Sequence, residues 1–171
     1  GSLTIFLTFS IMDGMQNEVF EKINSFNYNQ SMYYDSSDGL NIDKYDNNGI
    51  ETIVKIDGNN FSTFINVFAF DKFKNFINKK ISKHLLYNNN NYNSKSLLIG
   101  ETFSNTYNIN LGDTLIISDI TNINPINGNF KIEEYIVANI FSFPFLNYDL
   151  NNVYIPYNKK FFNRKINIIF N

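Results

Sequence analysis

The chain has 171 residues, enough for one domain or for one domain with a small subdomain, and its 14 basic and 16 acidic residues leave a formal charge of −2. This balance argues against nucleic-acid binding, which needs clustered cations to neutralise phosphates. The absence of cysteine and the single histidine, His84, exclude disulfides, thiolate metal sites, cysteine nucleophiles and multi-histidine metal sites.

The chain opens with an uncharged apolar stretch, Ser2–Met12, about half of the roughly 20 residues that a membrane-spanning helix needs. An apolar stripe then continues at helical spacing. Its members are Met12, Met15, Val19, Ile23 and Phe26. An apolar helix that becomes amphipathic at Asp13 is typical of a helix leaving a bilayer. We therefore expect residues 1–26 to be the end of a transmembrane helix and an amphipathic stalk; the alternative is that residues 2–12 form a buried core strand.

Three strands are predicted before residue 71, and turn residues close each of the first two. They are Gln30–Tyr34, Ile50–Ile56 and Phe61–Phe70. The strand over 50–56 alternates with period two: the even-numbered residues form one face, and Glu51, Ile53 and Lys55 form the other. The polar stretch Leu40–Asn48 suits a short helix.

A cationic helix is expected after the third strand, with Asp71 as its N-cap. Its inward-facing residues are predicted to be Phe73, Phe76, Ile77 and Ile81. Asn88–Ser94 lacks a periodic pattern and is the expected internal boundary. A core domain over residues 27–171 is therefore predicted to carry a subdomain insertion at approximately 59–95.

The second half is predicted to be mostly strands with short connections. The strands are Ser96–Ile99, Thr114–Ser118, Phe130–Phe141, Asn152–Pro156 and Lys165–Phe170. Short helices are expected at 101–107 and 157–163, a turn at Leu111–Asp113, and a loop at Asp119–Asn129. Because strands dominate and helices are interspersed, the predicted fold class is α+β with a mixed sheet.

Residues that could carry chemistry are sparse. Glu133 and Glu134 are neighbours in one predicted strand, so their carboxylates should point to opposite faces instead of converging in a cleft. His84 ends a lysine-rich helix with no acidic neighbour in sequence, and the eight glycines form no phosphate-binding loop. We therefore predict no catalytic, cofactor-binding or metal-binding residues.

Three sequence blocks carry a resemblance to a known family. They are Ser10–Val19 (SIMDGMQNEV), Leu97–Leu115 (LLIGETFSNTYNINLGDTL), and Phe130–Phe141 continued by Tyr148-Asp149 and Val153–Ile155. In this order they resemble blocks of LolC/LolE-type permeases, which belong to the MacB/FtsX-like group of ABC transporters. Ala138-Asn139 stands where the family has Val-Gly.

The resemblance implies a MacB-like periplasmic core domain of a permease in the bacterial inner membrane. Such a domain would catalyse nothing and bind no cofactor. It would transmit ATP-driven motion to hand a lipoprotein to its carrier. The implied partners are a cytoplasmic ATPase subunit, a second permease copy or paralogue, the lipoprotein cargo and a periplasmic carrier.

Two groups of residues are candidates for partner binding. The stalk stripe could pack against the equivalent helix of the partner permease, and we expect Met15 and Val19 to carry that contact. In the family, one permease type forms a carrier-binding hook between the two strands that follow Gly-Asp, and the corresponding segment here is Thr121–Asn129. The candidate residues are Met12, Met15, Val19 and Ile23 in the stalk, and Ile123, Pro125, Ile126 and Gly128 in the hook segment.

Two other functions stay open. A MacB/FtsX-like permease domain could act on another cargo or on a cell-wall enzyme. A soluble β-rich binding module would use residues 2–12 as an ordinary core strand, and apolar runs of about 20 residues would then be missing on either side of the domain.

Overall fold

The computed structural model of the chain describes residues 30–34, 49–123, 128–143, 147–158, 160–162 and 166–170. The expected membrane helix and stalk over 1–26, and the short helix in Leu40–Asn48, lie outside these residues. The strands are β1 (Gln30–Tyr34), β2 (Gly49–Asp57), β3 (Ser62–Phe70), β4 (Ser96–Gly100), β5 (Thr114–Ile123), β6 (Phe130–Phe141), β7 (Asn152–Pro156) and β8 (Ile166–Phe170). The helical segments are α2 (Phe73–Phe76), a π-helix (Ile77–Ile81), a 3₁₀ turn (Ser82–His84), α3 (Glu101–Tyr107) and α4 (Tyr148–Asn151).

Six of the strands close into a barrel, in the order β2, β3, β7, β4, β6 and β5, because β5 also pairs with β2. The β3–β7 and β4–β6 pairs are parallel, and the other pairs in the ring are antiparallel. The predicted α+β class with a mixed sheet is confirmed. The closure of that sheet into a barrel is an additional feature that the sequence pattern did not predict.

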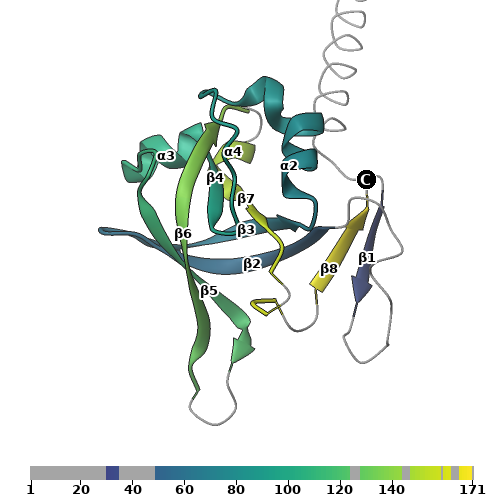
Figure 1. Ribbon diagram of the computed structural model, residues 1–171. Coiled ribbons are helices and arrows are strands. Elements are labelled where there is room, and N and C mark those ends of the chain that lie inside the picture. Colours follow the sequence, from purple (N-terminus) through teal and green to yellow (C-terminus); the bar gives the residue numbers. More distant parts are fainter. Residues whose placement is uncertain are drawn as a thin grey trace, which may run out of the picture.

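The two outermost strands form a ribbon attached to the barrel (Figure 1). β1 pairs with β8, and β8 pairs with β2 at Gly49, Ile50 and Glu51. β5 pairs with β2 at positions 55–57, farther along the strand. One strand, β2, therefore connects the ribbon with the β5–β6 hairpin.

Strand predictions were accurate at most boundaries, and three local predictions need correction. Asp71 is not the N-cap: Lys72 precedes the first helical residue, and no side chain caps that end. Among the described residues of 157–163 there is a turn in place of the predicted helix, closed by the amides of Phe161 and Phe162, which donate to the Asn158 carbonyl. The predicted loop at Asp119–Asn129 is shorter than expected, because pairing with β6 extends β5 to Ile123.

The barrel interior is a continuous hydrophobic core. Inward-facing residues of the six strands are buried at 0–3% exposure, among them Val54, Ile56, Ile65, Val67, Leu97, Ile99, Leu115, Ile117, Tyr135, Val137, Val153 and Ile155. Phe161 and Phe162, from the turn after β7, belong to the same core. The alternating pattern of the strands thus fills the barrel with β-branched and aromatic side chains.

A second core lies on the outer face of the barrel, where the helical segment that begins with α2 covers it (Figure 1). All four predicted inward-facing residues of that segment are buried. They pack on the outward-facing Phe68, Phe70, Leu98 and Tyr154. The helix therefore begins where burial requires it, and not at a capping side chain. Within the described part of the chain, none of the helices has the length and apolar character to cross a bilayer.

The predicted subdomain over residues 59–95 stays a prediction. β3, which lies within this range, pairs with β2 and β7 in the barrel. The segment Asn88–Ser94 contains no helix or strand, as expected for a boundary, but Tyr92 within it is buried in the outer core.

Candidate interaction surface

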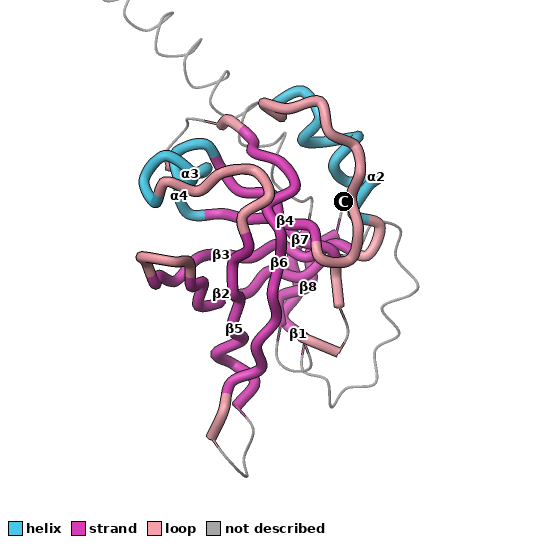
Figure 2. Tube along the Cα trace, turned by 60° about the vertical axis from the view of Figure 1, so that its left-hand side comes forward, coloured by secondary structure: helices cyan, strands magenta, loops and turns pink. Residues whose placement is uncertain are grey.

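Residues of the second and third sequence blocks are in contact at the start of α3. At this end of the barrel α3 and α4 lie side by side (Figure 2). The buried carboxylate of Asp149 accepts hydrogen bonds from the Thr102 amide (3.2 Å) and the Thr102 hydroxyl (2.8 Å). The backbone of Asp149 packs against Gly100 so closely that any Cβ at position 100 would overlap the Asp149 carbonyl. These residues therefore build the scaffold of the domain.

The Gly-Asp pair of the second block forms the turn into β5. Gly112 has a φ of +86°, a conformation that favours glycine. Its amide donates to the Val137 carbonyl (2.9 Å), and the Val137 amide donates to the Asp113 carbonyl (2.9 Å). The Asp113 carboxylate accepts a hydrogen bond from the Asn110 amide (2.7 Å). This turn aligns β5 with β6 and so fixes the start of the hairpin.

The β5–β6 hairpin extends well beyond the barrel (Figures 1 and 2). Two of the predicted hook residues, Ile123 and Gly128, belong to its far end. Ile123 is opposite Phe130, after an irregularity in the strand pairing, and Gly128 lies two residues before β6 with a φ of +70°. Pro125 and Ile126 lie outside the described residues, as do the four stalk candidates. The partner-binding role of all eight residues stays a prediction.

A polar cluster anchors the hairpin to the segment after β7. The Glu133 carboxylate accepts hydrogen bonds from Lys95 Nζ (3.0 Å), Asn158 Nδ2 (2.9 Å) and the Tyr135 hydroxyl (3.1 Å). Lys95 Nζ also lies 5.3 Å from the centre of the Tyr135 ring. Burial, reinforced by the Glu133 charge, raises the pKa of Tyr135. Glu133 thus joins three segments of the chain.

The remaining candidates for chemistry do not converge. Glu133 and Glu134 lie on opposite faces of β6, as predicted: Glu133 is half-buried on the side of Tyr135, whereas Glu134 is exposed on the outer face. His84 packs edge-on against Phe143, and burial lowers its pKa. Among the described residues, no three histidine or carboxylate side chains are grouped so as to bind a metal ion.

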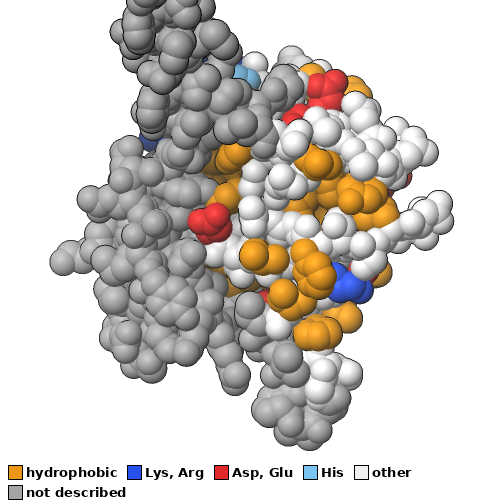
Figure 3. Space-filling model, turned by 180° about the vertical axis from the view of Figure 1, so that it is seen from behind, with side chains coloured by type: hydrophobic (Ala, Val, Ile, Leu, Met, Phe, Trp, Pro, Cys, Tyr) orange, Lys and Arg blue, Asp and Glu red, His pale blue; other side chains and the backbone are white. Residues whose placement is uncertain are grey.

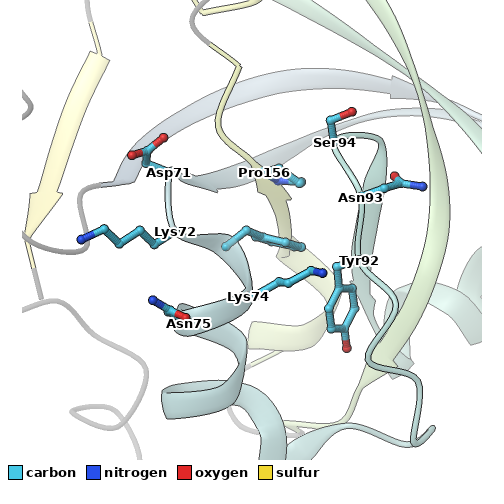
Figure 4. Close-up of a pocket in the computed structure, with 9 residues that line it drawn as sticks. Asp71, Lys72, Lys74, Asn75, Tyr92, Asn93, Ser94 and Pro156 are labelled. Carbon is cyan, nitrogen blue, oxygen red and sulfur yellow. The ribbon is translucent and has the colours of Figure 1, made fainter.

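A hollow of about 360 Å³ lies beside the start of α2 (Figure 4). It is lined by Asp71, Lys72, Phe73, Lys74, Asn75, Tyr92, Asn93, Ser94 and Pro156. Lys74 reaches toward Tyr92, while Asp71 and Lys72 point away from it (Figure 4). The charged side chains that line this hollow therefore do not point toward a common position.

The most distinctive surface is the outer face of β2, β3, β5 and β6, on the side of the barrel that α2 does not cover. Five large hydrophobic side chains are exposed there: Ile53 (53%), Phe64 (64%), Ile116 (38%), Ile132 (59%) and Ile136 (46%). Figure 3 shows hydrophobic side chains gathered on this face, above the hairpin. We call these five residues the apolar face. The sequence pattern does not predict this face, although Ile53 on the polar side of its strand is a signal of it.

Asn139 fixes the irregular segment before β4. Its side chain is fully buried; Nδ2 donates to the Tyr87 carbonyl (2.8 Å), and Oδ1 accepts from the Ile140 amide (2.9 Å). We expect Asn139→Leu to lower the free energy of unfolding by about 2–3 kcal/mol, because it leaves buried polar groups unpaired. Urea unfolding measures this, with the exposed Asn90→Ala as control. Equal stability of the two variants would contradict the assigned role.

Glu51 gives a pH-dependent prediction. Burial raises its pKa above the usual value, so its charged form opposes folding, and this cost grows as the pH rises through the folded-state pKa. We expect Glu51→Gln to raise Tm slightly at pH 7 and to have little effect at pH 4, where the wild-type carboxyl is protonated. Thermal unfolding at the two pH values checks this. A Tm increase of the same size at both would contradict it.

Comparisons with known proteins give limited similarity. No protein-family model matches the chain, and no curated protein matches it. Among solved structures, it is similar to the extracellular domain of the noncanonic ABC-type transporter YknZ from Gram-positive bacteria, at 12% identity and a TM-score of 0.48, covering 86% of this chain and 69% of that one. It is also similar to a domain of a protein described as a permease from Porphyromonas gingivalis, at 10% identity and a TM-score of 0.45, covering 84% of this chain and 61% of that one.

Proposed function

We propose that this chain is an extracytoplasmic domain of an ABC transporter permease of the MacB/FtsX-like group, and that it serves lipoprotein release from the bacterial inner membrane. The observation that carries the proposal is the set of three sequence blocks in family order. Its support within the fold is that residues of two blocks, Gly100 and Asp149, pack directly against each other. Blocks that resemble the family only by chance would not be expected to share such a contact.

In this proposal the domain is a mechanical part and not an enzyme. A separate cytoplasmic subunit hydrolyses ATP and moves the membrane helices, and the stalk over residues 12–26 transmits that motion. β1 follows the stalk in sequence and pairs with β8, which pairs with the edge of β2. The same edge of β2 pairs with β5. Motion would therefore pass from the ribbon through β2 to the β5–β6 hairpin.

The experiment that tests the proposal uses the full-length gene product in its native membrane. We expect the protein purified in detergent to bring with it an ATPase subunit that hydrolyses ATP. Lipoprotein release in reconstituted vesicles should require that hydrolysis. Recovery of the full-length protein in the soluble fraction, with no ATPase bound, would contradict the proposal.

A further inference from the structure

The apolar face spans four strands. Residues directly opposite each other in paired strands share a face, so Phe64, Lys55, Ser118 and Ile132 form one cross-strand row. The adjacent row consists of Ser62, Asp57, Ile116 and Glu134. Ile53 and Ile136 extend the two ends. The five hydrophobic side chains thus surround a small number of charged ones.

These side chains are not required by the core. The inward-facing neighbours Val54, Ile117 and Tyr135 already fill the barrel and are fully buried. On the other side of the barrel, outward-facing side chains of similar character, such as Phe68 and Tyr154, are covered by the chain's own helical segment. Uncovered apolar patches of this extent are typical of interaction sites.

The charges on this face identify the partner's chemistry. On this face Lys55 and Asp57 neutralise each other at 2.8 Å. Lys95 pairs at 3.0 Å with Glu133, which lies on the other side of β6, in phase with Tyr135. Glu134, in contrast, has no ion-pair or hydrogen-bond partner among the described residues, and its strand neighbours Ile132 and Ile136 are apolar. A hollow of about 540 Å³ lies beside it, lined by Lys95, Thr114, Ile132, Glu133, Glu134 and Ile136. This arrangement suits a partner that places one cationic side chain against Glu134 and aliphatic side chains against the apolar residues around it.

We propose that the apolar face binds another protein through a segment in which aliphatic side chains surround a single lysine or arginine, and that the cation pairs with Glu134. The apolar contacts would supply affinity, while the charge pair would fix the orientation and exclude acidic segments. The proposal goes beyond the transport function and does not depend on which cargo the permease carries.

The test is photo-crosslinking in the full-length chain in its native cell. p-Benzoylphenylalanine replaces Phe64, and the crosslinked segment is identified by mass spectrometry. The control position is Tyr87, which is 46% exposed but lies outside the apolar face. We expect one protein partner to be captured from position 64 and not from position 87, through an apolar segment that contains a lysine or arginine.

Variants of Glu134 test the charge pair. Glu134→Lys should reduce the crosslink yield about tenfold, because it places like charges together, and Glu134→Asp should retain most of it. Reversing the partner's cation to glutamate should restore crosslinking to the Glu134→Lys chain. Unchanged circular dichroism would show that the variants fold. Crosslinks only to lipid or to a second copy of this chain, no crosslink, or an unchanged yield with Glu134→Lys would each overturn the proposal.

Discussion

Gly100→Ala is expected to destabilise the domain by about 3–5 kcal/mol, a large part of the free energy of unfolding of a typical domain. The φ of Gly100 is −77°, which any residue can adopt. Alanine would even reduce the entropy of the unfolded chain. The loss of stability is purely steric, because the added Cβ would overlap the carbonyl oxygen, carbonyl carbon and Cα of Asp149. Relief would require a shift of α4 and would disturb the Asp149 hydrogen bonds to Thr102.

Gly112→Ala is the matched control for this prediction. A Cβ at position 112 meets nothing within 4 Å, but the φ of +86° strains any L-residue. Its expected cost is therefore only about 1–2 kcal/mol. Urea unfolding of the two variants compares the stability cost of steric overlap at position 100 with that of backbone strain at position 112. If Gly100→Ala were no less stable than Gly112→Ala, the close packing of Gly100 on Asp149 would be wrong.

Val19→Glu is expected to abolish lipoprotein release by the full-length permease. In the proposed mechanism Val19 lies at a helix–helix contact with the partner permease, where an unpaired carboxylate costs several kcal/mol to bury. The coupling between the two subunits would then be lost, while ATP binding and the fold of the domain would remain. Release from vesicles and the stability of the isolated domain are the two measurements.

Asn17→Glu is the control for the stalk. It introduces the same charge two residues from Val19, but on the opposite face of the expected helix from the apolar stripe of Met12, Met15 and Val19. We expect near-normal release from this variant. Unimpaired release by Val19→Glu would remove the proposed role of the stalk, and equal loss in both variants would show that negative charge alone, and not its position, is responsible.

The strands were predictable because their local signals agree. β6 begins and ends where predicted, at Phe130 and Phe141, since a segment rich in β-branched and aromatic residues lies there between breakers. The barrel was not predictable in this way. It closes because Lys55, Ile56 and Asp57 pair with β5, about 60 residues later in the chain, and no local propensity encodes that contact.

The start of α2 shows a second limit of sequence reasoning. Asp71 has the chemistry of a cap, yet the helix begins after Lys72 because Phe73 and Phe76 must reach the outer core. Tertiary burial here overrides the capping preference.

The apolar face is a different case, because its signal was present in the sequence. Ile53 occupies a side of β2 that is otherwise polar or charged, and Ile132 shares its side of β6 with the charged Glu134. Such positions suggest either a strand buried on both faces or an exposed interaction surface. Only the structure distinguishes the two, by showing that α2 covers the opposite side of the barrel and leaves this one open.

The most direct test of the permease assignment is the location of the domain relative to the membrane. Asn60→Cys, in the exposed turn between β2 and β3, introduces a reactive thiol into a domain without cysteine, and its labelling is compared with that of the unsubstituted protein. Spheroplasts that produce the full-length protein are treated with a membrane-impermeant maleimide. We predict labelling before lysis and recovery of the labelled protein with the membranes. Labelling only after lysis, or recovery in the soluble fraction, would contradict the assignment.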